Sequence, residues 1–366
     1  MSTDGVRHLI DRTRTEQTLP GAVWVTIRDG RATVDSVGHE PDSVFRIASL
    51  TKPLVAMLTL CLADRGVLAL DDRIDRWLPE LSGRRVLRVL GSDLDDTVPA
   101  RRALTVHDLL TMGMGFGWHP AFDGSQPLQR AITDHGLGPS AFAPAMHPGT
   151  WLEQVGALPM IHQPGEGWLY DSSHTALGIL LERAGGDDLD ALLAEHVTRP
   201  LGMGETTYTL DERTLPRLPA LLTGDPPTIE RPVGDPEANI TPAIRGGATG
   251  LFSSAADLTR LALAFLGEDT GLPGGVIDAM RQDHRAPGQR AMSELFLEPG
   301  TGWGYGVSVD LRPRYGSTDR FGWSGGTGTT LFADPRRRTA GILLTQVGFD
   351  AEFMSPLLKR FWQLTA

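Results

Sequence analysis

The sequence has very little of what would tie the chain to an oxidising compartment or a membrane. Cys61 is the only cysteine among 366 residues, so neither a disulfide within the chain nor a cysteine-based metal site can form. No stretch approaches the roughly 18 consecutive apolar residues of a membrane span. The polar first residues lack the apolar segment of a secretory signal. We therefore expect a soluble, cytoplasmic protein.

Positive charge is also scarce. The 34 lysines and arginines are outnumbered by 45 aspartates and glutamates, which gives a net charge of −11 with neutral histidines. This balance offers no basic footprint for nucleic acid and does not suit an anionic membrane surface. The ten histidines form no His-Glu-x-x-His or His-x-His pair, which argues against a zinc site. We expect no metal, no nucleic-acid partner and no membrane partner.

The pattern of apolar residues indicates a sheet built from both ends of the chain. Asp29-Gly30 lies between two strand-like runs and is a strong signal for a two-residue hairpin. Helical periodicity follows at 54–65 and again at 353–364. Runs typical of strands lie at residues 22–27, 32–37, 305–311, 328–333 and 339–345.

These patterns predict an α/β protein of the α+β type. A largely antiparallel sheet, built from both termini, is flanked by helices. Residues 1–75 and 235–366 are predicted to form this sheet domain, which is discontinuous in sequence. Residues 76–234 hold short helical segments split by proline- and glycine-rich loops, and are predicted to form a mostly helical inserted domain. We place the active site between the two.

The first motif with chemical content is Ser49-Leu50-Thr51-Lys52. Pro53 is tolerated only in the first turn of a helix, so the helix that follows begins near Ser49. Residues three apart share one helix face, which lets Lys52 hold or take the proton of the Ser49 hydroxyl. A serine needs such help because its free hydroxyl is a weak nucleophile.

Two further motifs give this serine a context. Residues 163–172 read QPGEGWLYDS and residues 321–328 read FGWSGGTG. With Ser-x-x-Lys, they resemble the serine β-lactamase and penicillin-binding-protein superfamily, in particular class C β-lactamases and, most of all, family VIII carboxylesterases. The resemblance extends over nearly the whole chain and implies a β-lactamase/transpeptidase-like fold. Supporting segments are LTVHDLLT at 104–111, PLGM at 200–203 and GGATGLFS at 246–253.

The resemblance implies a role for each matching residue. Ser49 is the acylated nucleophile, Lys52 is its partner, and Tyr170 matches the tyrosine that relays protons as general base and acid. The backbone N–H groups of Ser49 and Gly326 form the oxyanion hole. Which of Lys52 and Tyr170 takes the first proton stays open. A cation near Tyr170 is expected to lower its pKa and favour a phenolate.

The departures from the family pattern concern substrate binding. Ser172 replaces the asparagine of Tyr-x-Asn and still offers a hydrogen bond to Lys52 or to a substrate carbonyl. Trp323-Ser324-Gly325 replaces Lys-Thr-Gly, and we expect these three residues to line the substrate site. Trp323 carries no charge for a substrate carboxylate and offers an aromatic wall instead, which favours neutral, partly apolar acyl substrates.

Ser324 also has a competing interpretation. Residues 322–326 match Gly-x-Ser-x-Gly, the nucleophile elbow of α/β-hydrolases, which requires a helix directly after it. The segment that follows is typical of a strand, so we interpret Ser324 as a residue that lines the site. The aromatic residues Trp118, Trp303 and Tyr305 are interpreted as packing residues rather than as walls of an acyl pocket.

We therefore predict a serine hydrolase that cleaves small-molecule carboxylic esters through an acyl-enzyme on Ser49, with no cofactor. An acyltransferase or amide-forming enzyme uses the same intermediate and stays open, as does a D-amino-acid peptidase or amidase. A weak β-lactamase and a non-catalytic penicillin-binding-like protein are further alternatives. The sequence does not determine the acyl chain, the leaving group or the oligomeric state.

Overall fold

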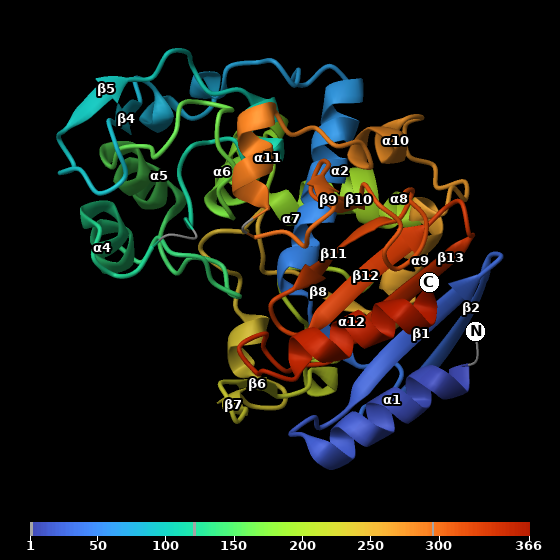
Figure 1. The fold of residues 1–366 in the computed structure, drawn as a ribbon. Coiled ribbons are helices and arrows are strands. Elements are labelled where there is room, and N and C mark those ends of the chain that lie inside the picture. Colours follow the sequence, from blue (N-terminus) through green and yellow to red (C-terminus); the bar gives the residue numbers. More distant parts are fainter. Residues whose placement is uncertain (1–2, 120–121, 295) are drawn as a thin grey trace.

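The computed structural model describes residues 3–119, 122–294 and 296–366. A seven-stranded sheet forms the centre of the molecule. The strands follow the order β2-β1-β13-β12-β11-β10-β9, and each neighbouring pair is antiparallel (Figure 1). This confirms the predicted fold class. The strands are β1 (Ala22–Arg28), β2 (Arg31–Val37), β9 (Thr301–Trp303), β10 (Ser308–Asp310), β11 (Phe321–Gly325), β12 (Thr329–Asp334) and β13 (Thr339–Leu344).

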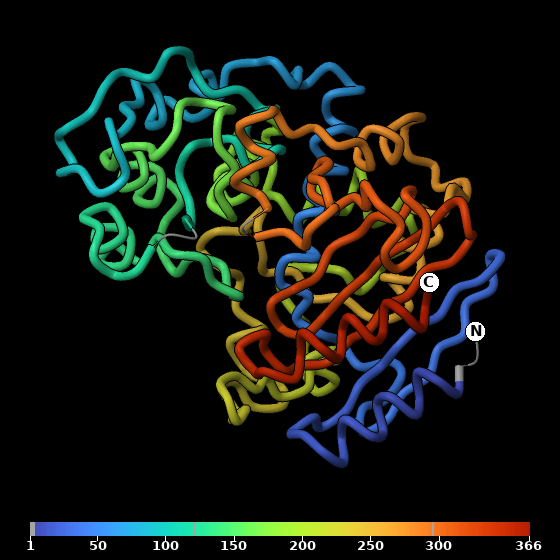
Figure 2. Tube along the Cα trace, viewed as in Figure 1, coloured from blue at the N-terminus to red at the C-terminus, as the bar shows by residue number. Residues whose placement is uncertain are grey.

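The hairpin at the start of the chain forms as its sequence predicts. Asp29 and Gly30 have φ values of +49° and +76°, the left-handed conformation that a tight two-residue turn between strands requires. Strand β1 then pairs on its other side with β13, with Val23 opposite Leu344. The first and last parts of the chain therefore lie side by side, as the blue and red segments of Figure 2 show.

Helices cover both faces of the sheet. Helices α1 and α12 pack against each other on one face, and α9 packs against β1, β12 and β13 on the other (Figure 1). The helices are α1 (Thr3–Glu16), α2 (Thr51–Asp64), α3 (Val106–Leu110), α4 (Pro127–Asp134), α5 (Pro148–Ala157), α6 (Ser172–Gly185), α7 (Leu189–Leu193), α8 (Arg199–Leu201), α9 (Ala255–Phe265), α10 (Val276–Met280), α11 (Pro287–Ser293) and α12 (Met354–Thr365).

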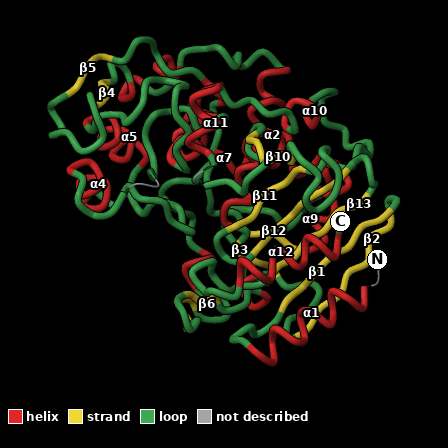
Figure 3. The backbone as a smooth tube through the Cα atoms, in the orientation of Figure 1, coloured by secondary structure: helices red, strands yellow, loops and turns green. Residues whose placement is uncertain are grey.

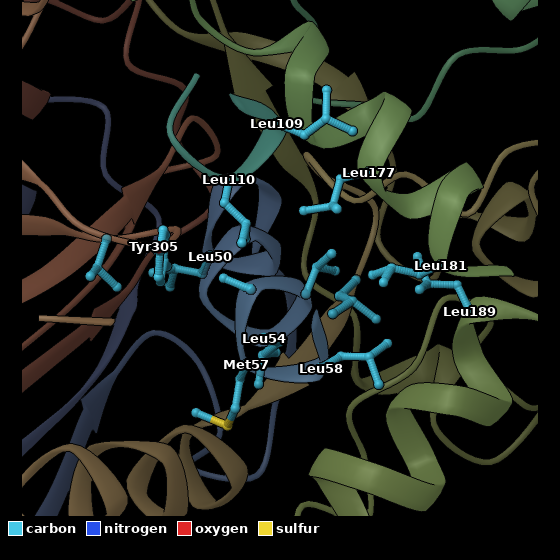
Figure 4. Packing of buried hydrophobic residues seen from close by; sticks show 14 of the residues in the cluster. Leu50, Leu54, Met57, Leu58, Leu109, Leu110, Leu177, Leu181, Leu189 and Tyr305 are labelled. Carbon is cyan, nitrogen blue, oxygen red and sulfur yellow. The ribbon is translucent and has the colours of Figure 1, made fainter. Parts of the chain in front are cut away.

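Helix α2 is buried along almost its whole length, from Thr51 to Leu62. It is apolar on all sides, as a helix surrounded by other elements must be. Leu54 and Leu58 belong to the same core cluster as Leu177 of α6 and Leu109 of α3, and Figure 4 shows these side chains around the helix. Lys52, near its start, is therefore held on a rigid and dry element.

The residues between 76 and 234 contain helices α3 to α8 and also short strands (Figure 3). The hydropathy pattern did not indicate these strands, which are only three or four residues long. The proposed boundaries of the inserted domain stay a prediction.

None of the helices in the described chain is long and apolar enough to cross a membrane. The short sheets pair β4 (Arg85–Leu87) with β5 (Thr97–Pro99), β6 (Leu221–Thr223) with β7 (Thr228–Arg231), and β3 (Val44–Arg46) with β8 (Phe252–Ser254).

Candidate active site

Ser49 lies in a tight corner between strand β3 and helix α2. A single 3₁₀ turn, Ala48–Leu50, connects the two, so the predicted helix start is correct to within one turn. Ala48 has φ +43°, a left-handed conformation that alanine adopts only when its surroundings enforce it. Hydroxyl groups of the β11–β12 hairpin supply that constraint, because Thr327 in its turn and Thr329 on β12 donate hydrogen bonds to the two carbonyls just before Ala48.

The Ser49 hydroxyl receives two hydrogen bonds. Lys52 Nζ donates to Ser49 Oγ at 2.8 Å, and the Tyr170 hydroxyl donates to the same oxygen at 2.8 Å. Lys52 Nζ also donates to the carbonyl of Ala248 at 2.8 Å. Tyr170 comes from the segment just before α6, 121 residues away from Ser49 in sequence. The structure therefore brings together the three residues that the motifs predict as the reacting groups.

Lys52 has an unusual electrostatic environment. Burial lowers the pKa of Lys52 to about 8, and the nearby carboxylate of Asp171 opposes this effect by raising it. The Asp171 carboxylate lies 3.9 Å from Lys52 Nζ, and both side chains are largely removed from water. An amine with a pKa near 8 is neutral in part of the molecules at neutral pH and can accept a proton from a serine hydroxyl.

The expectation that a nearby cation lowers the pKa of Tyr170 is wrong. Burial raises the pKa of Tyr170 well above its ordinary value, and the negative charge of Asp171 raises it further. The aromatic rings of Trp168 and Phe296 stack on the tyrosine and exclude water from it. Lys52 Nζ lies over the ring, 4.3 Å from its centroid, and does not offset this burial. Tyr170 therefore stays a neutral hydroxyl.

Trp323 contacts the same tyrosine from strand β11. Its indole Nε1 donates a hydrogen bond to the Tyr170 hydroxyl at 3.0 Å. The indole also packs edge-on against Trp303, with ring centroids 4.8 Å apart. Trp323 thus forms an aromatic wall, and it also supplies a neutral hydrogen-bond donor at a place where the family pattern has a lysine. Its sequence position predicts the wall, but the hydrogen bond to Tyr170 appears only in the fold.

Ser324 and Gly325, which follow Trp323 in the motif at residues 321–328, lie on the same strand, β11. Ser324 lies within strand β11, where its Oγ is 2.8 Å from Thr330 Oγ1. The strand continues into β12 and not into a helix, so this serine is not in a nucleophile elbow. At Gly325, a Cβ atom would stand 2.2 Å from the carbonyl oxygen of Ile47, so glycine lets β11 approach the Ser49 corner closely.

Gly326 and Ser172 are placed differently. Gly326 follows β11 and lines the same cavity as Ser49, with open space at its Cα. This placement suits the proposed oxyanion hole. Ser172 is buried at the first position of α6, and the residue that lines the cavity beside Lys52 is Asp171. Sequence reasoning missed Asp171, whose acidic side chain next to the motif tyrosine was the available signal.

Ser49 opens into a cavity of about 620 Å³ with mostly apolar walls. Trp118 lines this cavity, which corrects its interpretation as a packing residue only. The indole of Trp303 is buried and donates a hydrogen bond to the carbonyl of Leu110, and the Tyr305 hydroxyl lies 3.0 Å from His107 Nδ1. Aromatic residues that line the cavity are Trp118, Tyr170, Phe296, Tyr315, Trp323, Phe332, Phe349 and Trp362.

Nothing in the described part of the chain gathers three or more histidine, cysteine, aspartate or glutamate side chains in the way a metal ion requires. The reacting groups at Ser49 are a hydroxyl, an amine and a phenol. A buried amine beside a serine hydroxyl at hydrogen-bond distance is an arrangement for covalent acyl transfer. The fold and this site together define a serine hydrolase.

Comparisons with known proteins agree with this class. The Beta-lactamase family profile matches residues 6–358, and the chain belongs to that family. Protein Rv1367c of Mycobacterium tuberculosis is 31% identical over 360 residues, which cover 92% of this chain and 88% of that protein. Esterase EstB of Burkholderia gladioli is 28% identical over 372 residues, or 93% of this chain and 90% of the esterase.

Among solved structures, EstCE1 has the same fold. It is described as a hydrolase with promiscuous acyltransferase activity, and it superposes with a TM-score of 0.81 over 98% of this chain and 97% of its own. The sequence identity is 21%, so this likeness concerns the fold alone.

Proposed function

We propose that this protein is a serine carboxylesterase that cleaves neutral, partly apolar esters through an acyl-enzyme on Ser49. One observation carries the proposal. The Ser49 hydroxyl is hydrogen-bonded to both Lys52 and Tyr170 at the end of an aromatic cavity in which Trp323 occupies the place of a charged residue. The full-length similarity to Esterase EstB supports it.

In the acylation step, neutral Lys52 accepts the proton of the Ser49 hydroxyl while Oγ bonds to the carbonyl carbon of the ester. The carbonyl oxygen becomes an oxyanion, which the N–H groups of Ser49 and Gly326 stabilise. The bond to the leaving alkoxide breaks, and the Tyr170 hydroxyl gives its proton to that oxygen. Tyr170 regains a proton from the lysine ammonium, so no net charge remains on either residue.

In the second step, a water molecule attacks the acyl carbon and loses one proton to the neutral Lys52 amine. The bond between Ser49 Oγ and the acyl carbon breaks, and the proton returns to the serine. The raised pKa of Tyr170 keeps its hydroxyl protonated, so Lys52 takes the first proton and Tyr170 gives its own proton only to the strongly basic leaving alkoxide. Each proton that leaves one group therefore has a named acceptor.

Substrate class is tested by comparing two chromogenic substrates on one preparation. We expect kcat/KM for a p-nitrophenyl ester of short to medium chain to exceed that for a chromogenic cephalosporin. Trp323 offers one neutral donor and no charge for the cephalosporin carboxylate. A cephalosporin preferred by more than about tenfold, or roughly 1.4 kcal/mol in the transition state, rejects the esterase in favour of a β-lactamase.

Acyl transfer is the second candidate, and the size of the cavity favours it. A volume of about 620 Å³ leaves room for an alcohol or amine acceptor beside a short acyl group. EstCE1, with the same fold, is described as having promiscuous acyltransferase activity. Product analysis with an added alcohol separates the two activities, because transfer yields a new ester while hydrolysis yields only the acid. A D-amino-acid amide as substrate tests the amidase alternative in the same assay.

A further inference from the structure

The cavity at Ser49 continues well beyond the reacting groups. It follows strand β11 past Ser324 and reaches helix α12, whose Leu358, Lys359 and Trp362 line it. Helix α12 is anchored there, because the Trp362 indole donates to Thr330 Oγ1 at 3.1 Å. A small ester does not fill this space. The end of the cavity next to α12, which we call the α12 end, is therefore available to a more distant part of the substrate.

The side chains that line the α12 end include three cations, Lys359, Arg314 and Arg320, and two carboxylates, Glu298 and Asp310. Glu298 receives hydrogen bonds from both Lys359, at 2.9 Å, and Arg314. These bonds outweigh the effect of burial and lower the pKa of Glu298, so the carboxylate is ionised. Farther in, Arg320 has its own partner, Asp310, at 3.2 Å. One carboxylate is thus shared by two cations, in a chain whose net charge is −11.

At the α12 end, Lys359 and Arg314 keep N–H donors that the shared Glu298 carboxylate does not use. An ammonium has three N–H donors and a guanidinium five, whereas Glu298 occupies only part of them. Arg314 is held in place, since it also donates to the carbonyl of Pro299 at 3.0 Å. The side chains of Lys359 and Arg314 are 45% and 27% exposed, so both can be reached from the cavity and from solvent. A second carboxylate would complete this arrangement.

We propose that Lys359 and Arg314 form an anion subsite for a carboxylate that the ester carries away from its scissile carbonyl. This inference rests on the proposed esterase function and refines its substrate class. The ester group itself lies against neutral Trp323 at the Ser49 end, and the remote carboxylate lies at the α12 end. The substrate is therefore amphipathic, with an apolar middle along the aromatic wall.

The carboxylate can belong to the acyl part or to the alcohol part, and two substrate pairs distinguish these. The acyl pair is 4-nitrophenyl hemiglutarate and 4-nitrophenyl valerate. The alcohol pair is 4-(butanoyloxy)phenylacetate and its methyl ester. For each pair, the measured quantity is the ratio of kcat/KM for the carboxylated ester to that for the neutral ester at low ionic strength.

We expect Lys359→Met to lower this ratio about threefold in one of the two pairs, the scale of a half-exposed ion pair. The double variant Lys359→Met/Arg314→Met should lower it about tenfold. Glu298→Gln should raise it about threefold, because it removes the carboxylate that competes for both cations. An increase of this kind cannot arise from misfolding. Addition of 0.5 M NaCl should reduce all three effects.

Arg360 supplies the matched control, because it lies next to Lys359 on α12 but is exposed and bonded to Gln363. Arg360→Met should leave the ratio unchanged in both pairs. If the ratio is also unchanged in the Lys359, Arg314 and Glu298 variants while neutral esters are hydrolysed, the subsite is rejected and the esterase stands. If the wild-type protein hydrolyses neither the neutral nor the carboxylated ester of either pair, the proposed function fails, and this inference fails with it.

Discussion

A lysine–carboxylate pair lies near each end of the cavity, and the two pairs differ in burial. Lys52 and Asp171 are 3.9 Å apart, with side chains 0% and 11% exposed. Lys359 and Glu298 are closer, at 2.9 Å, but 45% and 30% exposed. At the Ser49 end, burial lowers the pKa of the lysine to about 8 and makes it a base. At the α12 end, water screens the charges and leaves a lysine suited to binding.

The comparison teaches that distance alone does not rank ion pairs. The Coulomb energy of a pair depends on the effective dielectric constant as strongly as on separation, and exposed pairs contribute only about 0–1 kcal/mol. Substitutions at the Ser49 end should therefore have large effects on catalysis, and substitutions at the α12 end small, salt-dependent effects on substrate choice. The following predictions test this contrast, beginning with the largest effect.

The nucleophile should give the largest effect. Ser49→Ala removes the atom that forms the acyl-enzyme, and we expect kcat for a p-nitrophenyl ester to fall by at least about 10³-fold. Intact-mass analysis after fluorophosphonate treatment should find the label on Ser49. Ser324→Ala should retain clear turnover and labelling, because its hydroxyl bonds to Thr330 and not to the reacting groups. A label on Ser324 would reverse the assignment.

Removal of either proton carrier should come next. Lys52→Met and Tyr170→Phe should each lower kcat by about 10²-fold, the usual contribution of general acid–base catalysis, and should change KM much less. Near-native kcat in Tyr170→Phe would remove the tyrosine from the mechanism. Thermal unfolding of both variants, measured in parallel, checks that the loss is chemical and not a loss of folded protein.

Substitution of the buried carboxylate should shift the pH dependence of the reaction. Lys52 acts as a base only when neutral, so kcat/KM should rise with pH up to about pH 8. Asp171 raises the pKa of this lysine, so Asp171→Asn should lower the pKa and move the rising limb to lower pH. We expect a movement of roughly half to one pH unit, equivalent to about 0.7–1.4 kcal/mol.

Glu298→Gln is the matched control for that pH measurement, because it removes a carboxylate from the exposed lysine–carboxylate pair. The rising limb of its profile should stay in place. If the rising limb moved equally in Asp171→Asn and Glu298→Gln, removal of either carboxylate would have the same effect. Burial would then not be what distinguishes the two ends of the cavity. A limb that moves to higher pH in Asp171→Asn would contradict the role of Lys52 as the base.

The hydrogen bond from Trp323 should give the smallest effect. Trp323→Phe keeps an aromatic wall but removes the N–H donor to Tyr170, and we expect kcat to fall about two- to tenfold. In the Tyr170→Phe background the same substitution should cost little more, because the acceptor is already absent. Equal losses in both backgrounds would show that the indole acts by another route. Trp323→Lys should also weaken turnover of neutral esters.

Much of the fold follows from local sequence signals. Apolar runs near both ends predicted five of the seven strands of the sheet, and Asp29-Gly30 predicted its first turn. The sequence patterns did not reveal β9, β11, β3, β8 or the short strands between residues 76 and 234. Strand β11 reads FGWSG, in which glycines interrupt the apolar alternation, and the other missed strands have only three or four residues, too few to display it. Within the site, the motifs predicted Ser49, Lys52 and Tyr170 as the residues that meet.

The sequence alone determined which chemical groups lie close together on a single helix or strand. Ser49 and Lys52 meet because residues three apart share a helix face, and Pro53 specifies where that helix begins. Only the tertiary structure decided the electrostatics. Trp323 reaches Tyr170 across 153 residues of chain, and the packing around Tyr170 raises its pKa where its sequence context suggested the reverse. The reason is physical: desolvation depends on every neighbour that excludes water, and those neighbours are assembled only when the chain folds.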